Sequence, residues 1–206
     1  MIHLLDYGAG NITSVHSAFK RCGAEISVVS DSFDNTAIRS LVIPGVGSFA
    51  SAMLHIRQTG WEQRILTEAA RGTKILGICL GMQILFEEGT EGGTSSGLGL
   101  IGGTVLPLSS IYDGRLPHIG WNNVSIVASE SDIFFGIKDN LDFYHVHSYF
   151  CSPSEPTCVL ATTELGQPFA SVVQNDNILG IQFHPEKSQP AGLKLLNNIV
   201  DWFEQC

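Results

Sequence analysis

Short runs of consecutive apolar residues alternate with helical periodicity over the first half of the chain. The runs are IHLLD, EISVV, LVIPG and KILGI, and turn-forming residues bound them. Between them, apolar residues recur at helical spacing near 11–23, 49–58 and 61–71, with Asn11 as a candidate N-cap of the first helix. Strands that are apolar along their whole length and separated by helices are typical of a parallel sheet covered on both faces.

The second half of the chain predicts mainly strands. The segments GLGLIGGTVLPL, WNNVSIV, DFYHVHSYF, CVLATTEL, FASVVQ and ILGIQF follow one another with little helix between them. The sequence QNDN predicts a hairpin turn between the last two, and a final helix is expected at about 189–204. We therefore predict an α/β fold, with an open, mainly parallel sheet flanked by helices and an added antiparallel section. Neither a linker nor a repeat interrupts the pattern, so a single domain is expected over residues 1–206.

Composition narrows the function. The 206 residues are 44% hydrophobic and 15% charged, which is typical of a globular domain. The net charge of −9 argues against nucleic acid as a main partner. No apolar run reaches the ~18 residues of a membrane span, and the N-terminus does not resemble a signal peptide. Five cysteines, with no CxxC and no zinc-type spacing, favour a reducing cytoplasm. No metal and no cofactor are expected.

The segment from 74 to 88, KILGICLGMQILFEE, begins as a buried strand and continues with helical spacing to its end. Cys79 lies at the junction between Gly77 and Gly81, a G-x-C-x-G turn that matches the thiol version of a nucleophile elbow. Glycines are expected on both sides because a Cβ atom would clash in so sharp a turn. The following helix would favour the thiolate, and the N–H of Leu80 could donate to an oxyanion. The alternative is a buried, unreactive cysteine.

A nucleophilic cysteine needs a base and a group that orients it. The best candidates stand in LGIQFHPEKS, where an apolar strand ends in His184 and Glu186 follows two residues later. Pro185 stops the strand, so the imidazole would lie at the carboxyl edge of the sheet, where open α/β sheets bind their ligands. His147 in HVHSY is the rival base, although its place within a strand fits a packed or backbone-bonded histidine equally well.

A glycine-rich turn follows the strand LVIPG. Its N–H groups could form an anion nest, but the phosphate-binding pattern GxxxxGK[ST] is absent. The segment DYGAGN lacks the third glycine of a dinucleotide-binding loop. Gly45 and Gly47 permit backbone conformations closed to other residues. We hypothesise that the Gly45–Val46 peptide rests with its N–H turned away from the site, and that occupancy of a distant site favours a flipped state in which the N–H of Val46 points towards the oxyanion.

Taken together, PGVGSF, GICLGMQ and GIQFHPEKS, in this order and separation, resemble the class I (triad) glutamine amidotransferases over nearly the whole chain. The resemblance implies a nucleophile, a base and an orienting carboxylate, which are Cys79, His184 and Glu186. It implies oxyanion donors in the turn and the elbow: Val46, Gly47 and Leu80. It further implies a glutamine site lined by Gly45, Gln83, Glu91, His147, Ser148 and Tyr149. The assignment of Glu91 rests on a segment of variable length.

Further segments, among them DYGAGN, LPHIGWNNV and FYHVHSY, resemble the branch of the family that serves histidine biosynthesis. That branch implies a heterodimer in which a (β/α)8-barrel cyclase receives the ammonia. The implied contact residues are Asn11, Trp121 and Lys187, although Trp121 alone could equally be a core residue. Competing interpretations are another class I amidotransferase, of the pyridoxal-phosphate-forming or anthranilate type, and a non-enzymatic flavodoxin-like binding module.

Overall fold

The computed structural model describes residues 1–33 and 37–205. Five parallel strands form one half of its sheet, in the order β2 (Ile26–Val29), β1 (Ile2–Leu5), β3 (Ser40–Gly45), β4 (Lys74–Cys79) and β13 (Ile178–Ile181). The register places Gly45 opposite Cys79 and Ile78 opposite Ile181. The carboxyl ends of β3, β4 and β13 therefore meet at one edge of the sheet. The predicted parallel core is confirmed.

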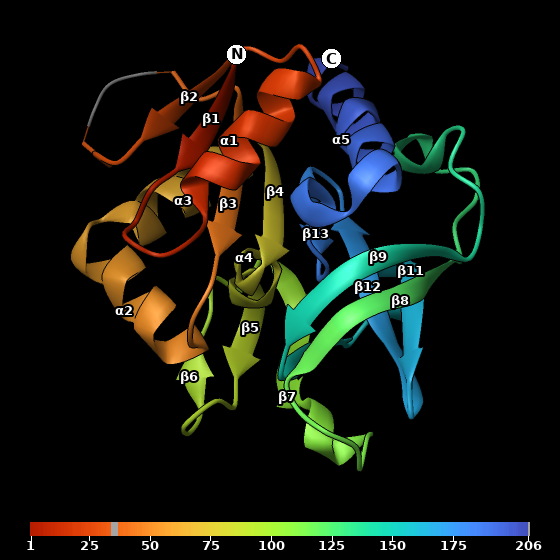
Figure 1. Cartoon of the computed structure of the whole chain (residues 1–206). Helices are drawn as coiled ribbons and strands as arrows, with labels where there is room; N and C mark the ends of the chain where they lie inside the picture. Colours follow the sequence, from red (N-terminus) through yellow and green to blue (C-terminus); the bar gives the residue numbers. More distant parts are fainter. Residues whose placement is uncertain (34–36, 206) are drawn as a thin grey trace.

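Helices cover both faces of these strands (Figure 1). On one face α1 (Ile12–Arg21) and α5 (Gln189–Glu204) pack on a core that includes Leu4, Val42 and Leu76. On the other face α2 (Phe49–Gln58) and α3 (Trp61–Ala70) pack on Leu5, Leu41, Ile43 and Ile75. Both sides of each central strand are thus buried, which explains why these strands read as continuous apolar runs. None of the described helices is both long and apolar enough to cross a membrane.

The rest of the sheet is mainly antiparallel and continues from β13. Next to β13 lie, in order, β12 (Gln167–Asn175), β10 (Tyr149–Pro153), β7 (Ile101–Pro107), β5 (Phe86–Gly89) and β6 (Ser95–Ser96). A branch leaves β12 through β11 (Val159–Leu165) to β8 (His118–Ile126) and β9 (Leu141–His147). The predicted hairpin between β12 and β13 is present, with Asn175 opposite Ile178. Short 3-10 turns lie at Leu108–Ser110, Asp132–Phe134, Pro156–Cys158 and Pro185–Lys187.

Two local predictions were wrong. The helix after Cys79 is only α4 (Leu80–Ile84), and the apolar residues expected to extend it enter β5, where Phe86 pairs with Ile101. The segment DFYHVHSYF is two strands, β9 and β10, that separate at Ser148. β9 pairs with β8, whereas β10 pairs with β7 and β12. Both differences arise from pairing with distant strands, which local periodicity does not contain.

Candidate active site

Cys79 occupies a strained turn between β4 and α4. Its backbone has φ 56° and ψ −111°, which is rare for a residue with a side chain and costs on the order of 1–3 kcal/mol. A Cβ on Gly81 would lie 1.8 Å from the carbonyl oxygen of Ile43, and one on Gly77 would lie 2.5 Å from the carbonyl oxygen of Gly81. The turn therefore has room only for glycine at these two positions, as the elbow interpretation requires.

His184 and Glu186 form a buried pair beside this turn. His184 Nδ1 lies 2.8 Å from Glu186 Oε1, and both side chains are almost inaccessible to solvent. The backbone N–H of His184 donates to the carbonyl of Tyr144 on β9 at 2.9 Å. Ser188 reinforces the link, because its hydroxyl donates to the His184 carbonyl and accepts from the N–H of Tyr144. The antiparallel strands β8 and β9 form a two-stranded ribbon. The imidazole of His184 is thus held between β13 and this ribbon.

The electrostatics of His184 favour its protonated form. Burial alone lowers the pKa of His184, but the side chains of Cys79 and Glu186 outweigh burial and raise this pKa from 6.5 to about 9. Among the described residues, the other ring nitrogen, Nε2, has no hydrogen-bond partner. One nitrogen is therefore fixed by a carboxylate, while the other is available for proton transfer next to a thiol.

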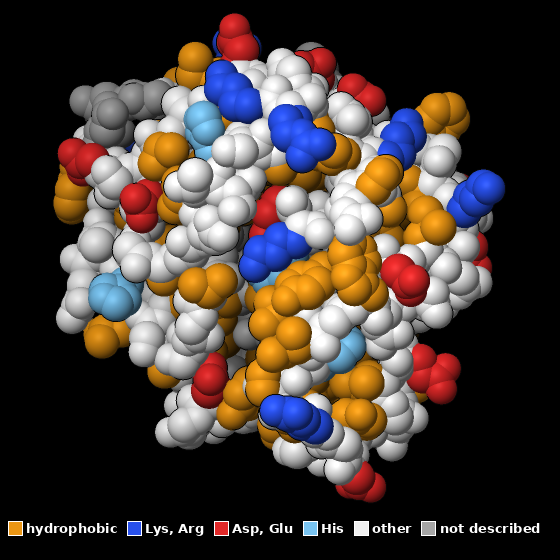
Figure 2. Space-filling model, viewed as in Figure 1, with side chains coloured by type: hydrophobic (Ala, Val, Ile, Leu, Met, Phe, Trp, Pro, Cys, Tyr) orange, Lys and Arg blue, Asp and Glu red, His pale blue; other side chains and the backbone are white. Residues whose placement is uncertain are grey.

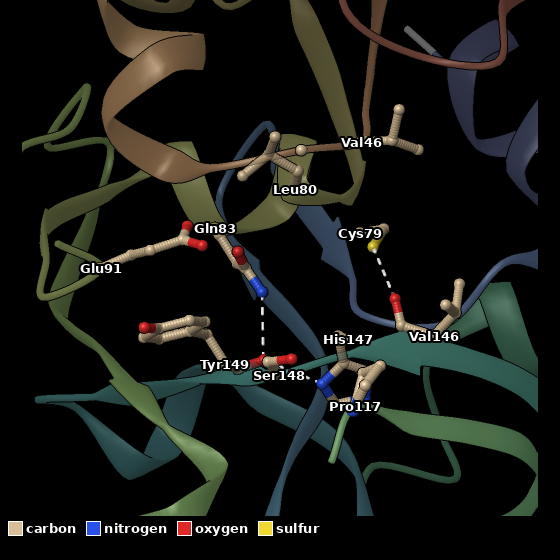
Figure 3. Close-up of a pocket in the computed structure, with 11 residues that line it drawn as sticks. Val46, Cys79, Leu80, Gln83, Glu91, Pro117, Val146, His147, Ser148 and Tyr149 are labelled. Carbon is tan, nitrogen blue, oxygen red and sulfur yellow. Dashed lines mark hydrogen bonds between the residues drawn. The ribbon is translucent and has the colours of Figure 1, made fainter.

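A pocket of about 260 Å³ opens beside Cys79 (Figure 3). Cys79 Sγ lies 3.8 Å from the carbonyl oxygen of Val146, which forms part of the opposite wall. The pocket is lined by Val46, Gly47, Cys79, Leu80, Gln83, Glu91, Pro117, Val146, His147, Ser148 and Tyr149. Gly45 lies outside this set, in a smaller cavity with Asn11, His184 and Glu186. The structure thus brings the predicted catalytic, oxyanion and substrate residues together. They line this pocket or, in the case of His184 and Glu186, form the buried pair beside Cys79. Gly45 is the exception, because it lines the smaller cavity next to that pair.

Two polar side chains, those of Gln83 and Glu91, line the pocket (Figure 3). Gln83 Nε2 donates to the carbonyl of Tyr149 at 3.1 Å and to Gln182 Oε1 at 3.2 Å. Glu91 Oε2 accepts the N–H of Phe49 at 2.7 Å, at the N-terminus of α2. That position is favourable for a carboxylate because the helix dipole is positive there. Glu91 consequently presents a fixed negative charge at the pocket wall.

The glycine-rich turn crosses the mouth of the pocket. Gly47 has φ 107°, a conformation that favours glycine, whereas the φ of Gly45 lies outside the left-handed region. A Cβ on Gly45 would instead lie 2.6 Å from Tyr7 Oη and 2.9 Å from Leu80 Cβ. In this conformation Gly45 is needed for close packing rather than for backbone freedom. A Gly45→Ala variant would therefore perturb packing as well as any flip of the turn.

Comparison with known proteins identifies the family. A family model described as "Glutamine amidotransferase class-I" matches residues 3–202. The chain belongs to this family. It is 43% identical over 200 residues to "Imidazole glycerol phosphate synthase subunit HisH" of Rhodopirellula baltica, covering 97% of each protein. It is 44% identical over 197 residues to the protein of that name from Moorella thermoacetica, covering 96% of this chain and 92% of the other.

Solved structures confirm the class I amidotransferase fold. The structure of PurLQS from Thermotoga maritima superposes with a TM-score of 0.79 at 19% identity, over 98% of both chains. A crystal structure of a protein named only as a glutamine amidotransferase gives a TM-score of 0.71 at 20% identity, over 98% of this chain and 96% of the other. At such low identity, these two likenesses bear on the fold alone.

His147 does not have the geometry of a base in this family member. Its Nδ1 lies 2.8 Å from the carbonyl oxygen of Tyr149, and its Nε2 lies 3.2 Å from His145 Nδ1. Burial lowers the pKa of His147 to about 3, partly offset by the bond to Tyr149. Both ring nitrogens are thus engaged. Of the two candidate bases, the geometry favours His184.

The three residues predicted to contact a partner are all exposed. Trp121 is 46% exposed, so it is not a core residue. Its ring lies 6.0 Å from that of Tyr144, over which Lys187 Nζ lies at 5.7 Å. Asn11 is exposed at the start of α1. Figure 2 shows apolar side chains gathered over the ribbon of β8 and β9, with basic side chains beside them.

Three polar groups near Cys79 were missed by sequence reasoning. The hydroxyl of Tyr7 is buried without a hydrogen-bond partner among the described residues, and burial, then the nearby Cys79, raises its pKa. Gln182 Nε2 lies 4.0 Å from Cys79 Sγ. The third is the carbonyl of Val146. Tyr7 and Gln182 each follow the end of a parallel strand, and that position was the signal that could have revealed them.

Proposed function

We propose that this chain is the glutaminase subunit of an imidazole glycerol phosphate synthase, acting in histidine biosynthesis. It hydrolyses glutamine to glutamate and ammonia, and a separate cyclase subunit receives the ammonia. The observation that carries the proposal is the elbow cysteine beside the buried pair of His184 and Glu186, at the wall of an amino-acid-sized pocket. The relatives named HisH support the assignment to this synthase.

The chemistry follows from these positions. The thiolate of Cys79 attacks the carboxamide carbon of glutamine, and the negative charge on the carbonyl oxygen is stabilised by N–H groups of Leu80 and of the turn at Val46 and Gly47. His184 donates its proton to the departing nitrogen, so ammonia leaves and a γ-glutamyl thioester forms. His184 then accepts a proton from water, which attacks the thioester. Glutamate is released and the thiol is restored, with no cofactor required.

The pocket walls suit the rest of the substrate. The carboxylate of Glu91 would pair with the α-ammonium group of glutamine, and Gln83 would contact the substrate from α4. The segment His147, Ser148 and Tyr149 would contribute both backbone and side-chain contacts. Glu186 has a different role in this scheme: it holds Nδ1 of His184 and favours the imidazolium that forms when the thiol ionises.

The partner proposed is a (β/α)8-barrel cyclase in a heterodimer. It would use ammonia to form imidazole glycerol phosphate and an aminoimidazole carboxamide ribonucleotide. The surface proposed for docking contains Asn11, Trp121 and Lys187. An exposed aromatic ring and a lysine, both beside the Tyr144 ring and with the lysine directly after Glu186, are the kind of patch that forms an interface anchor.

The test separates glutamine use from ammonia use in the assembled complex. Cys79→Ala should reduce glutamine-dependent synthesis by at least about 10³-fold, because the thioester cannot form. Synthesis supplied with ammonium salt should remain, since the cyclase is a different chain. Cys158→Ala, a partly buried cysteine outside the pocket, is the matched control and should retain both activities. If Cys79→Ala retained glutamine-dependent synthesis, Cys79 would not be the nucleophile. If the intact wild-type complex were inactive with glutamine, the proposed function would be wrong.

A further inference from the structure

Three histidines gather on the inner side of the ribbon formed by β8 and β9. His118 on β8 pairs with His147 on β9, and His145 lies two residues before His147, so its side chain is on the same face. The cluster lies between two cavities: His147 lines the candidate active site, and His118 lines a second cavity of about 460 Å³. His145, between them, is completely buried.

One ring nitrogen of each histidine lies within 4.8 Å of those of the other two. His145 Nδ1 and His147 Nε2 are only 3.2 Å apart. Two nitrogens bound to one tetrahedral zinc ion at 2.0–2.1 Å lie about 3.4 Å apart. Two of the three rings are therefore already at ligand spacing. The third needs to approach by at most about 1.4 Å, which small rotations of the rings would supply.

The cluster contains a buried ring nitrogen that has no hydrogen-bond partner within the part of the chain that the structure describes. Among the described residues, His118 Nδ1 is buried without a hydrogen-bond partner. A buried nitrogen lone pair without a donor is costly, and a metal ion is one group that satisfies it.

The surroundings of His147 match those of a metal ligand. Its Nδ1 lies against the Tyr149 carbonyl, which can only accept, so Nδ1 carries the hydrogen and Nε2 presents its lone pair towards the cluster. Metal-binding histidines usually donate their second ring N–H to a carbonyl or carboxylate in this way. Access is also provided, because His118 is only partly buried and faces the second cavity.

We propose that His118, His145 and His147 bind one divalent transition-metal ion of the zinc type. Imidazole ligands favour Zn²⁺, Cu²⁺ and Ni²⁺ over Mg²⁺ and Ca²⁺, which prefer oxygen. Three histidines leave a fourth tetrahedral position for water. His145 would move its hydrogen from Nδ1 to Nε2 on binding, a tautomer change that releases no net proton. The site does not depend on glutamine hydrolysis.

The experiment measures Zn²⁺ binding to the chelator-treated full chain, by titration against a competing chromophoric chelator. Wild type should bind one equivalent, and His118→Asn should weaken binding at least about 100-fold through loss of a direct ligand. His55→Asn, at an exposed histidine outside the cluster, is the matched control and should bind as wild type does. Cys79→Ala should also bind as wild type does. Co²⁺ in the site should give a tetrahedral visible spectrum without a thiolate charge-transfer band.

Several outcomes would overturn the site. They are no stoichiometric Zn²⁺ bound by wild type, equal binding by His118→Asn, or a thiolate band that disappears with Cys79→Ala. The last outcome would place the ion at the nucleophile instead. Circular dichroism checks that His118→Asn is folded, with His118→Ala as a second variant. If neither variant folds, the Co²⁺ spectrum of wild type and of Cys79→Ala decides between imidazole and thiolate ligands.

Discussion

The two walls of the candidate active site are built in different ways. On one wall, the reactive groups lie where the parallel strands β3, β4 and β13 end. Short turns and closely packed glycines hold these groups in place. On the other wall, the ribbon of β8 and β9 supplies carbonyl groups, neutral histidines and exposed aromatic rings. The first wall carries the groups that can exchange protons or form a covalent bond with the substrate. The second wall carries groups suited to non-covalent contacts with a substrate or a partner.

This difference separates chemistry from recognition. His184 joins the walls, because it follows β13 but its N–H bonds to Tyr144 on the ribbon. A change on the parallel wall should therefore alter the rate of glutamine hydrolysis directly. A change on the outer side of the ribbon should alter partner binding and leave hydrolysis by the isolated chain nearly unchanged. Loss of Cys79, described above, is the largest effect expected from the first wall.

Glu186→Gln is the next largest change on the parallel wall. We expect a fall in kcat for glutamine hydrolysis on the order of 10²-fold, because the amide still holds the imidazole but no longer favours its charge. Asp142→Asn, an exposed carboxylate on the ribbon, is the matched control and should retain activity. Equal losses for Glu186→Gln and Cys79→Ala would show that Glu186 does more than orient His184.

The same variant should change how stability depends on pH. The pKa of His184 is raised from 6.5 to about 9 in the folded chain, so its protonation stabilises the fold. This stabilisation is complete below about pH 6.5 and is lost as the pH rises through about 9. Glu186→Gln removes one charge that raises this pKa, so the free energy of unfolding should fall less over that range. Denaturant unfolding at several pH values measures the free energy of unfolding of wild type and of Glu186→Gln. The same pH dependence in both proteins would contradict the coupling between Glu186 and His184.

Trp121→Ala tests the outer side of the ribbon. An aromatic anchor at an interface contributes about 2 kcal/mol, which corresponds to about a 30-fold rise in the Kd of the complex with the cyclase. Phe135→Ala, at another exposed aromatic residue away from the pocket mouth, should leave the Kd unchanged. A Trp121→Ala chain that binds the cyclase as tightly as wild type would remove Trp121 from the interface.

The parallel wall was predictable because its determinants are local. The buried runs, the cap at Asn11 and the two glycines around Cys79 each express a nearby steric or hydrogen-bonding need. The order of strands then follows from the rules for parallel sheets, which bring the ends of β4 and β13 together. The roles of the triad remain predictions until the variants are measured, as does the single domain over 1–206, but the geometry that they require is present.

The ribbon was less predictable because distant segments define it. The sequence does not show that strand pairing changes partner at Ser148, or that His118 meets His145 and His147 across two strands. The expectation of no metal considered only cysteine spacing, whereas this cluster joins His118 to two histidines that lie 27 and 29 positions later in the chain. Likewise, Phe86 continues the helical periodicity but is held in β5 by pairing with Ile101.

Asn11 lines the small cavity that also contains His184 and Glu186, and its variant should have the smallest effect. Its side chain accepts the N–H of Ser14 at 3.1 Å and caps α1, so Asn11→Ala should lower the free energy of unfolding by about 1 kcal/mol. Asn11→Ser can still cap the helix and should keep the stability of wild type. If Asn11 also contacts the cyclase, Asn11→Ser should weaken the complex without destabilising the chain. Unchanged affinity in Asn11→Ser would assign this residue to the helix cap alone and confine the interface to the ribbon and Lys187.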